Sequence, residues 1–377
     1  MQHTVASLLL LSLIICTLKY FQGRNTLKDG EKQQNGLEPP VIEAVSDNFK
    51  WESEKPFPYR PFKKGLYKMN LAIRKLDPND IICIEDTYLE RTELRETLFE
   101  TEKLYGCHDS AIDALREAYA FVFDHLIKRY PMYFEYSRDK SMITNKIRNV
   151  EVPTNTNFMK PEELLKIIAT NIEEDVFILI KNPDTDQPDE YILRAGISLF
   201  PAGFNPLEKL NQPLTKIHGP VPNYKEKLQT SMNKFFARLK PYEFIVRNNW
   251  SIQTHTNICA PTGSHATPDE AKVIHPLYPE DLDFNKCFFR VEKQCFTRLP
   301  ISGADIMFIR TYTTPLMELR KSLSDEEKET LCSAIDGITD GFSIYKKRIQ
   351  WGEAAKSFIK GESNGSNPRI ERYKFIH

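Results

Sequence analysis

The order of strand-like and helical segments constrains the fold of this chain more than any other feature. Short runs that are apolar throughout, or that alternate with polar residues as strands do, occur in five places. Helical stripes, with apolar residues at steps of three and four, occur among them without strict alternation of strand and helix. This order predicts an α+β fold in which an antiparallel sheet of about five strands is flanked by helices. The predicted strands are 176–180, 191–200, 244–254, 288–298 and 306–313.

Apolar stripes and terminal signals also place the helices. Pro131 ends the first stripe and Pro161 begins the second, because proline interrupts a helix but is tolerated in its first turn. Ser324 and Glu327 have the spacing of a capping box and predict the start of a last helix. The stripes run over 112–126, 164–172 and 228–239.

An apolar run near the start is the one segment that bears on location. Residues 5–18 carry no charged side chain, and the positive residues Lys19, Arg24 and Lys28 follow this run while none precedes it. This asymmetry favours a single-pass membrane anchor helix that leaves the rest of the protein on the cytosolic side, as in the endoplasmic reticulum membrane. A cleaved signal sequence, with a secreted or luminal protein, is the alternative.

We therefore expect four segments along the chain. Residues 1–21 are the membrane anchor or signal sequence, and residues 22–48 form a polar tether. Residues 49–355 form the folded domain, and residues 356–377 form a polar tail.

Composition excludes some classes of protein. The chain has 51 Lys+Arg and 52 Asp+Glu, a net charge of -1, which argues against a strongly basic nucleic-acid-binding protein. Its seven cysteines form no CxxC pair and predict mostly free thiols in a reducing compartment. No P-loop, GxGxxG or HExxH motif is present, so a redox activity would draw its electrons from a separate protein.

A histidine in a stiff turn is the first candidate for chemistry. His218 precedes Gly219, Pro220 and Pro222, which disfavour a helix there and hold the backbone extended. Such a turn can direct one imidazole toward an apolar cavity, as an axial iron ligand requires. The alternative is a histidine that is simply hydrogen-bonded within a loop.

A row of charged residues on one strand is the second candidate. Arg290, Glu292, Gln294 and Arg298 lie at even steps, so alternation places them on one side of the predicted strand. Arginines on a concave sheet can bind the carboxylates of a ligand, although a solvated sheet face explains the pattern equally. Residues of neighbouring strands that could join this surface are Arg247, Trp250 and Arg310.

Several longer stretches occur in a specific order. LRAGISLFPAGFNPLEKLNQPLTKIHGPVPNYKEKL occupies 193–228, and RNNWSI occupies 247–252. FFRVEKQCFTRLPISGADIMFIRTYTTPL follows at 288–316, and KRYP precedes them at 128–131. In this order and spacing the chain resembles the haem-dependent oxidative N-demethylase family of bacteria and fungi, over roughly residues 56–350.

The resemblance implies a PAS-like domain that holds haem b. Members of this family use haem iron and dioxygen to hydroxylate an N-methyl group of a small amine, which then releases formaldehyde. The resemblance also implies that a separate flavin and iron–sulfur reductase supplies the electrons.

Carried onto this sequence, the resemblance suggests roles for five residues. His218 is the candidate proximal ligand of the haem iron. Arg247, Arg298 and Arg310 are candidates for contacts with the haem propionates or the substrate. Glu292 is the candidate catalytic residue that binds an ammonium substrate, since a buried cation needs a carboxylate. The alternative for this carboxylate is an ion pair with a neighbouring cation of its own strand, Arg290 or Lys293.

Two other functions stay open at this point. One is a non-catalytic PAS-like module that binds haem or a small molecule, because a fold does not by itself define an activity. The other is a luminal type II membrane transferase, which would carry glycans at Asn249 or Asn364 and disulfides in its domain.

Overall fold

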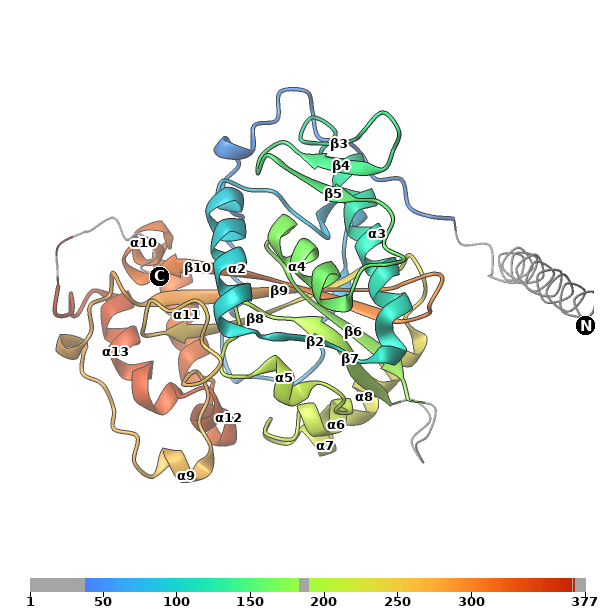
Figure 1. Cartoon of the computed structure of the whole chain (residues 1–377). Helices are drawn as coiled ribbons and strands as arrows, with labels where there is room; N and C mark the ends of the chain where they lie inside the picture. The colour runs from blue at the N-terminus through green and yellow to red at the C-terminus, as the bar shows by residue number, and fades with distance from the viewer. Residues whose placement is uncertain (1–37, 183–189, 368, 370–377) are drawn as a thin grey trace, which may run out of the picture. The chain divides into compact units, whose positions relative to one another are not determined.

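A seven-stranded antiparallel sheet is the centre of the molecule (Figure 1), in a computed structural model that describes residues 38–182, 190–367 and 369. The strand order is β1-β8-β9-β10-β6-β7-β2, and each neighbouring pair is antiparallel. The strands are β1 (Arg74–Lys75), β2 (Tyr105–Cys107), β6 (Asp175–Lys181), β7 (Tyr191–Ile197), β8 (Ile245–Gln253), β9 (Phe288–Arg298) and β10 (Asp305–Pro315).

The α+β class and the five predicted strands are confirmed, but the predicted sheet size of about five strands is wrong. The two added strands, β1 and β2, are two and three residues long, too short to show a period in the sequence. A separate three-stranded sheet is also present in the described chain, made of β3 (Phe134–Tyr136), β4 (Met142–Asn145) and β5 (Val150–Pro153).

Strands β9 and β10 form the longest hairpin of the sheet. Their register pairs Arg298 with Asp305 at the turn and continues without a shift to Phe288 and Pro315. The turn between them is held from outside, because the Glu117 carboxylate accepts hydrogen bonds from the backbone N–H groups of the turn at 2.7 Å. Side chains at even and odd positions of β9 therefore define the two faces of the sheet.

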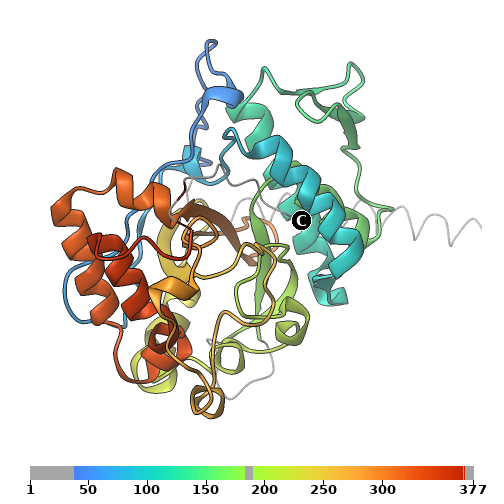
Figure 2. The ribbon, with the colours of Figure 1, turned by 90° about the vertical axis from the view of Figure 1, so that its left-hand side faces the viewer.

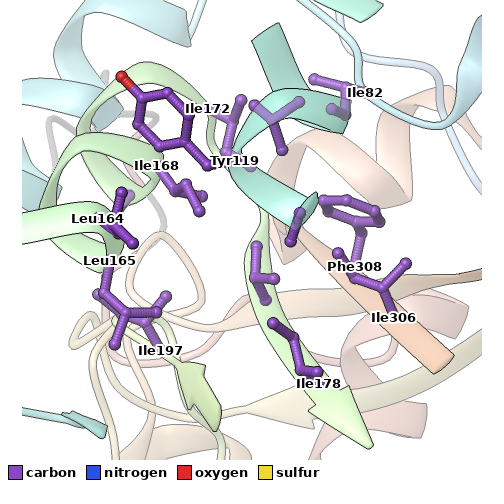
Figure 3. Close-up of a cluster of buried hydrophobic side chains, with 14 of the residues drawn as sticks. Ile82, Tyr119, Leu164, Leu165, Ile168, Ile172, Ile178, Ile197, Ile306 and Phe308 are labelled. Carbon is purple, nitrogen blue, oxygen red and sulfur yellow. The ribbon is translucent and has the colours of Figure 1, made fainter. Parts of the chain in front are cut away.

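The face that carries the odd positions of β9 is apolar over most of its area. At one end it packs against α2 (Tyr88–Glu102), α3 (Ile112–Arg129) and α4 (Pro161–Asn171) (Figure 1). Figure 3 shows this core, where Ile178, Ile306 and Phe308 of the sheet meet the helical side chains. Burial of such a cluster supplies the main stabilising term of the fold.

The other end of the same face packs against the C-terminal helices, which gather on one side of the molecule (Figure 2). Phe289 and Val291 of β9 contact buried residues of these helices, including Leu331 and Trp351. The capping box predicted for Ser324 and Glu327 is confirmed at the start of α11, but α11 is not the last helix. This group comprises α10 (Leu316–Ser322), α11 (Asp325–Asp336), α12 (Asp340–Tyr345) and α13 (Arg348–Lys360).

The opposite face of the sheet has an apolar half and a polar half. Its apolar half, with Phe177, Phe296 and Ile309, packs against Met232 and Phe236 of α8. Its polar half lies on β8 and β9 and is described below. The short helices on this side are α5 (Pro206–Lys209), α6 (Leu214–Ile217), α7 (Tyr224–Lys227), α8 (Gln229–Arg238) and α9 (Pro268–Ala271). Single 3-10 turns occur at η1 (Trp51–Ser53), η2 (Pro78–Asp80), η3 (Asp109–Ala111) and η4 (Pro279–Asp281).

The predicted anchor lies outside the described residues, as does most of the predicted tether. Over the part of the chain that the structure describes, no helix combines the length and the apolar character needed to cross a bilayer. The six cysteines of that part are free thiols.

Truncation of Phe308 should destabilise the protein strongly. Its ring is fully buried between the sheet and α3, so Phe308→Ala leaves a cavity, and we expect a loss of about 3–5 kcal/mol in the free energy of unfolding. Phe158 is 94% exposed, so Phe158→Ala should stay within about 0.5 kcal/mol of wild type. Urea titration of the two variants checks this, and equal losses would contradict the described core.

Candidate functional site

The polar half of the sheet is a ladder of paired side chains on β8 and β9. The register sets Arg247 opposite Gln294 and Asn249 opposite Glu292, and continues with Ser251 opposite Arg290. Directly opposed residues of antiparallel strands project to the same side. The prediction that Arg290, Glu292, Gln294 and Arg298 share one face is therefore correct.

Two of the residues predicted for this surface lie elsewhere. Trp250 is paired with Val291 and Arg310 with Lys293, and both pairs belong to the odd face of β9. Trp250 could not share a side with Arg247, because residues three apart on one strand point in opposite directions. The expectation that Trp250 and Arg310 join the charged row is wrong.

Glu292 lies at the centre of the ladder and keeps a small exposed fraction. Its Oε2 accepts hydrogen bonds from Gln294 Nε2 at 3.1 Å and Asn249 Nδ2 at 3.5 Å. Its Oε1 lies 3.5 Å from Nε of Arg290. The ion pair proposed as an alternative is thus present with Arg290, while Lys293 points to the other face.

Lys346 lies just after α12, far along the sequence from β8, and its side chain contacts residues of the ladder strand β8. Its Nζ donates to Asn249 Oδ1 at 3.0 Å and to the backbone oxygen of Trp250 at 2.9 Å. Burial lowers the pKa of Lys346 to about 8, while the charge of Glu292 acts in the opposite direction. Sequence reasoning missed this lysine, because it lies 97 residues from Asn249 and no local motif marks it.

His218 is the C-cap residue of the short helix α6. Its Nδ1 lies 2.9 Å from the backbone oxygen of Leu214, which can only accept, so Nδ1 carries the proton. The ring stacks on Tyr224 with a centroid separation of 4.8 Å. Burial lowers the pKa of His218 to about 4, and nearby Arg247 adds to this effect. The imidazole is therefore neutral near pH 7, with its Nε2 lone pair available.

A hollow of about 610 Å³ is lined by the turn that follows His218, although His218, Arg247 and Glu292 are not among its lining residues. One wall is the turn and helix at 219–226, and the other contains Ala266, Pro268 and Tyr345. Tyr345 also connects the hollow to the ladder, since burial raises the pKa of Tyr345 to about 12 and the charge of Glu292 adds to that shift. The volume lies within the usual range for small-ligand sites.

Among the described residues, neither Arg247 nor Lys346 has a carboxylate within 4.0 Å, but Lys346 donates to two neutral oxygens. Arg247 has a buried Nε without a hydrogen-bond acceptor. Burial lowers the pKa of Arg247, while Tyr67 and Glu292 oppose this. An unpaired guanidinium of this kind is expected where an anionic group of a ligand binds.

Arg298 makes hydrogen bonds within the fold and does not line the hollow. Its Nε and Nη2 donate to the Asp305 carboxylate at 2.8 and 3.2 Å, across the first pair of the β9–β10 hairpin. Nη2 also donates to Tyr191 Oη and to the backbone oxygen of Phe236. This guanidinium joins β9, β10, β7 and α8.

Arg310 is fully buried on the opposite face, among three carboxylates. Its Nη2 lies 2.6 Å from Glu85 Oε2 and 2.6 Å from Glu173 Oε1, and its Nη1 lies 3.1 Å from Glu174 Oε1. Nη1 also donates to the backbone oxygen of Cys83 at 2.7 Å. Because these contacts hold its guanidinium on the odd face of the sheet, Arg310 does not line the hollow.

His218 and Arg247 are of the residue types that hold a haem group, although neither lines the hollow. A metal-binding histidine usually donates its second N–H to a backbone or carboxylate oxygen, as His218 does to Leu214. The unpaired Arg247 is of the residue type that binds a propionate. The described residues hold no cluster of three or more His, Cys, Asp or Glu suited to a bare metal ion. Haem requires only an axial ligand from the protein.

The fold and the site together define an α+β protein whose sheet carries a polar ladder near His218, a neutral histidine with a hydrogen-bonded Nδ1. Residues 72–356 match the model of one protein family, described as haem-dependent oxidative N-demethylase, alpha subunit-like. The match covers more than half of the chain, so this protein belongs to that family. A search of curated proteins found no match.

Removal of Arg310 should cost stability without touching the hollow. Arg310→Met leaves three buried carboxylates without their cation, and we expect a loss of about 3–5 kcal/mol in the free energy of unfolding. The matched control is Lys128→Met, which removes an exposed ion pair with Asp124 and should cost at most about 0.5 kcal/mol. Chemical denaturation of both variants measures the difference.

Lys346 should make the free energy of unfolding depend on pH in the alkaline range. Its pKa is about 8 in the folded protein and its ordinary value is 10.5, so between these values the unfolded chain holds a proton that the folded one has lost. The free energy of unfolding therefore gains a positive slope with pH in this window. We expect Lys346→Met to remove that slope. Identical wild-type and variant profiles between pH 8 and 10 would contradict the lowered pKa.

Proposed function

We propose that this chain is a haem-dependent oxidative N-demethylase. Its family membership supports the general class, and the observation that carries the proposal is the neutral His218, whose Nδ1 is already bound to Leu214 and whose ring stacks on Tyr224 of the hollow. In this proposal His218 Nε2 is the proximal ligand of a b-type haem. The sheet with its flanking helices is then a PAS-like domain.

The reaction would remove a methyl group from a small amine. When bound, haem supplies the activation of dioxygen. An N-methyl carbon is hydroxylated, with one oxygen atom entering the C–H bond and the other leaving as water at the expense of two electrons and two protons. The product carbinolamine breaks its C–N bond to give formaldehyde and the shorter amine.

The side chains of this protein bind and orient the reactants in the proposal. Glu292 holds the ammonium form of the amine, and Gln294 and Asn249 fix the orientation of its carboxylate. Arg247 faces an anionic group of the haem or of the substrate. His265, stacked on Tyr345 at 4.2 Å, helps to close the site to water. Arg298 and Arg310 take no part, since both are held by carboxylates of the fold.

Electrons would come from a separate flavin and iron–sulfur reductase. The family resemblance supports this proposal, as does the lack of a flavin or nicotinamide fingerprint in the sequence. The apolar run at 5–18 supports attachment to a membrane, with the domain on the cytosolic side of the endoplasmic reticulum.

The first of the two sequons does not support the luminal transferase, whereas Asn364 of the second is exposed. Asn249 of the first sequon lies within β8, and its side chain is hydrogen-bonded to Glu292 and Lys346, so it is not available to carry a glycan. The domain cysteines within the described residues are free thiols.

Absorption spectroscopy of purified protein loaded with haem tests the proposal. We expect a Soret band in wild type that is lost or shifted in His218→Ala, because this variant removes the proposed axial nitrogen. The control is His108→Ala, which changes an exposed histidine of the β2–α3 connection and should leave the band unchanged.

Two outcomes would contradict this proposal. A wild-type protein without a Soret band would exclude haem binding. A Soret band without formaldehyde release from any N-methylamine, in the presence of dioxygen and an artificial electron donor, would leave a haem-binding module that is not an enzyme.

A further inference from the structure

We propose that the ligand of the polar ladder is a zwitterion, an N-methylated amino acid, with its carboxylate on Arg247 and its methylammonium group on Glu292. The inference names the substrate class of the proposed demethylase and, for its chemistry, rests on that function. The binding claim itself depends only on the residues of β8 and β9.

Arg247 differs from the other buried arginines of this protein. Arg95 lies 2.7 Å from Asp175, Arg298 lies 2.8 Å from Asp305, and Arg310 lies 2.6 Å from both Glu85 and Glu173. Arg290 has Glu292 at 3.5 Å. Within the described chain Arg247 has no such partner, whereas a buried Nε without an acceptor is a feature that it shares with Arg290 and Arg310. A carboxylate from a ligand would complete the pairing that the others already have.

Arg247 and Glu292 carry opposite charges on the same face but do not neutralise each other. They are diagonal neighbours in the ladder, since Arg247 is opposite Gln294 and Glu292 is opposite Asn249. Diagonal positions lie roughly 7–8 Å apart, a spacing comparable to that of the two charged ends of a short ligand with their contacts. Gln294 and Asn249 hold Glu292 in place, so its carboxylate does not turn toward Arg247. The two ends of an amino acid match this arrangement of charges.

The charge balance of the site disfavours a ligand with only a positive charge. Arg247, Arg290 and Lys346 surround the single carboxylate Glu292. A simple dialkylammonium ion would add another positive charge to a site in which cations already outnumber carboxylates. A zwitterion brings none, and its carboxylate meets the unpaired guanidinium.

Binding of two amines that share the methylammonium group tests the inference. N-methylglycine and dimethylammonium are titrated by calorimetry into the full chain, both without haem and loaded with haem. We expect N-methylglycine to bind wild type at least tenfold more tightly than dimethylammonium, since a charge-assisted hydrogen bond contributes roughly a factor of ten or more.

Variants assign the two ends of the ligand. Arg247→Met should weaken N-methylglycine roughly tenfold to hundredfold and leave dimethylammonium unchanged or slightly tighter. Glu292→Gln should weaken both amines, because both present an ammonium group. The control Arg138→Met alters an exposed arginine and should change neither affinity. Circular dichroism confirms that each variant is folded.

The results separate this inference from the proposed function. Equal affinities of the two amines in both states of the protein would overturn it, as would an Arg247→Met variant that binds N-methylglycine like wild type. If that variant instead loses haem while N-methylglycine binding is unchanged, Arg247 binds a propionate and the inference fails. A wild-type protein that prefers N-methylglycine but shows no Soret band would contradict the proposed function and still support the zwitterion site.

Discussion

The buried guanidinium of Arg310 is the interaction on which much of this structure depends. It donates hydrogen bonds to three carboxylates, Glu85, Glu173 and Glu174, from two separate segments and fixes them against the centre of β10. Each of these groups would be costly to bury alone, because the protein interior does not replace the water around a charge. Since the carboxylates lie just before α2 and just before β6, the network sets where two elements begin. The network therefore helps to position the helical layer over the odd face, in addition to the apolar contacts of that layer.

The opposite face uses its charges differently. Its cations outnumber its carboxylates near the ladder, and one of them, Arg247, lacks a partner among the described residues. A surplus of this kind lowers stability, so its presence beside a hollow and a neutral histidine supports a binding role rather than a structural one. The buried charges of Arg310 are thus paired within the fold, whereas the ladder on the opposite face retains a cation without an ion-pair partner among the described residues.

Much of this fold could be predicted from the sequence, and the limits have physical causes. The five long strands and the helices of 112–126, 164–172 and 228–239 were found because each repeats its pattern over several residues. Strands β1 and β2 are too short to repeat, so the sheet was underestimated. Alternation within β9 placed Glu292 correctly, but the face of Arg310 depends on the register across a turn, which the pattern does not contain. Lys346 joins the site only through tertiary contacts.

The bond from Lys346 to the backbone oxygen of Trp250 has a consequence for solubility. Strand β8 has a neighbour on its outer side only at Ile245 and Val246, where β1 pairs with it, and the rest of that side is a sheet edge. An open edge of backbone oxygens and N–H groups can pair with a strand of another molecule and start aggregation. Lys346 occupies one of these oxygens with a charged side chain, so this position of the edge is not open to pairing with another strand.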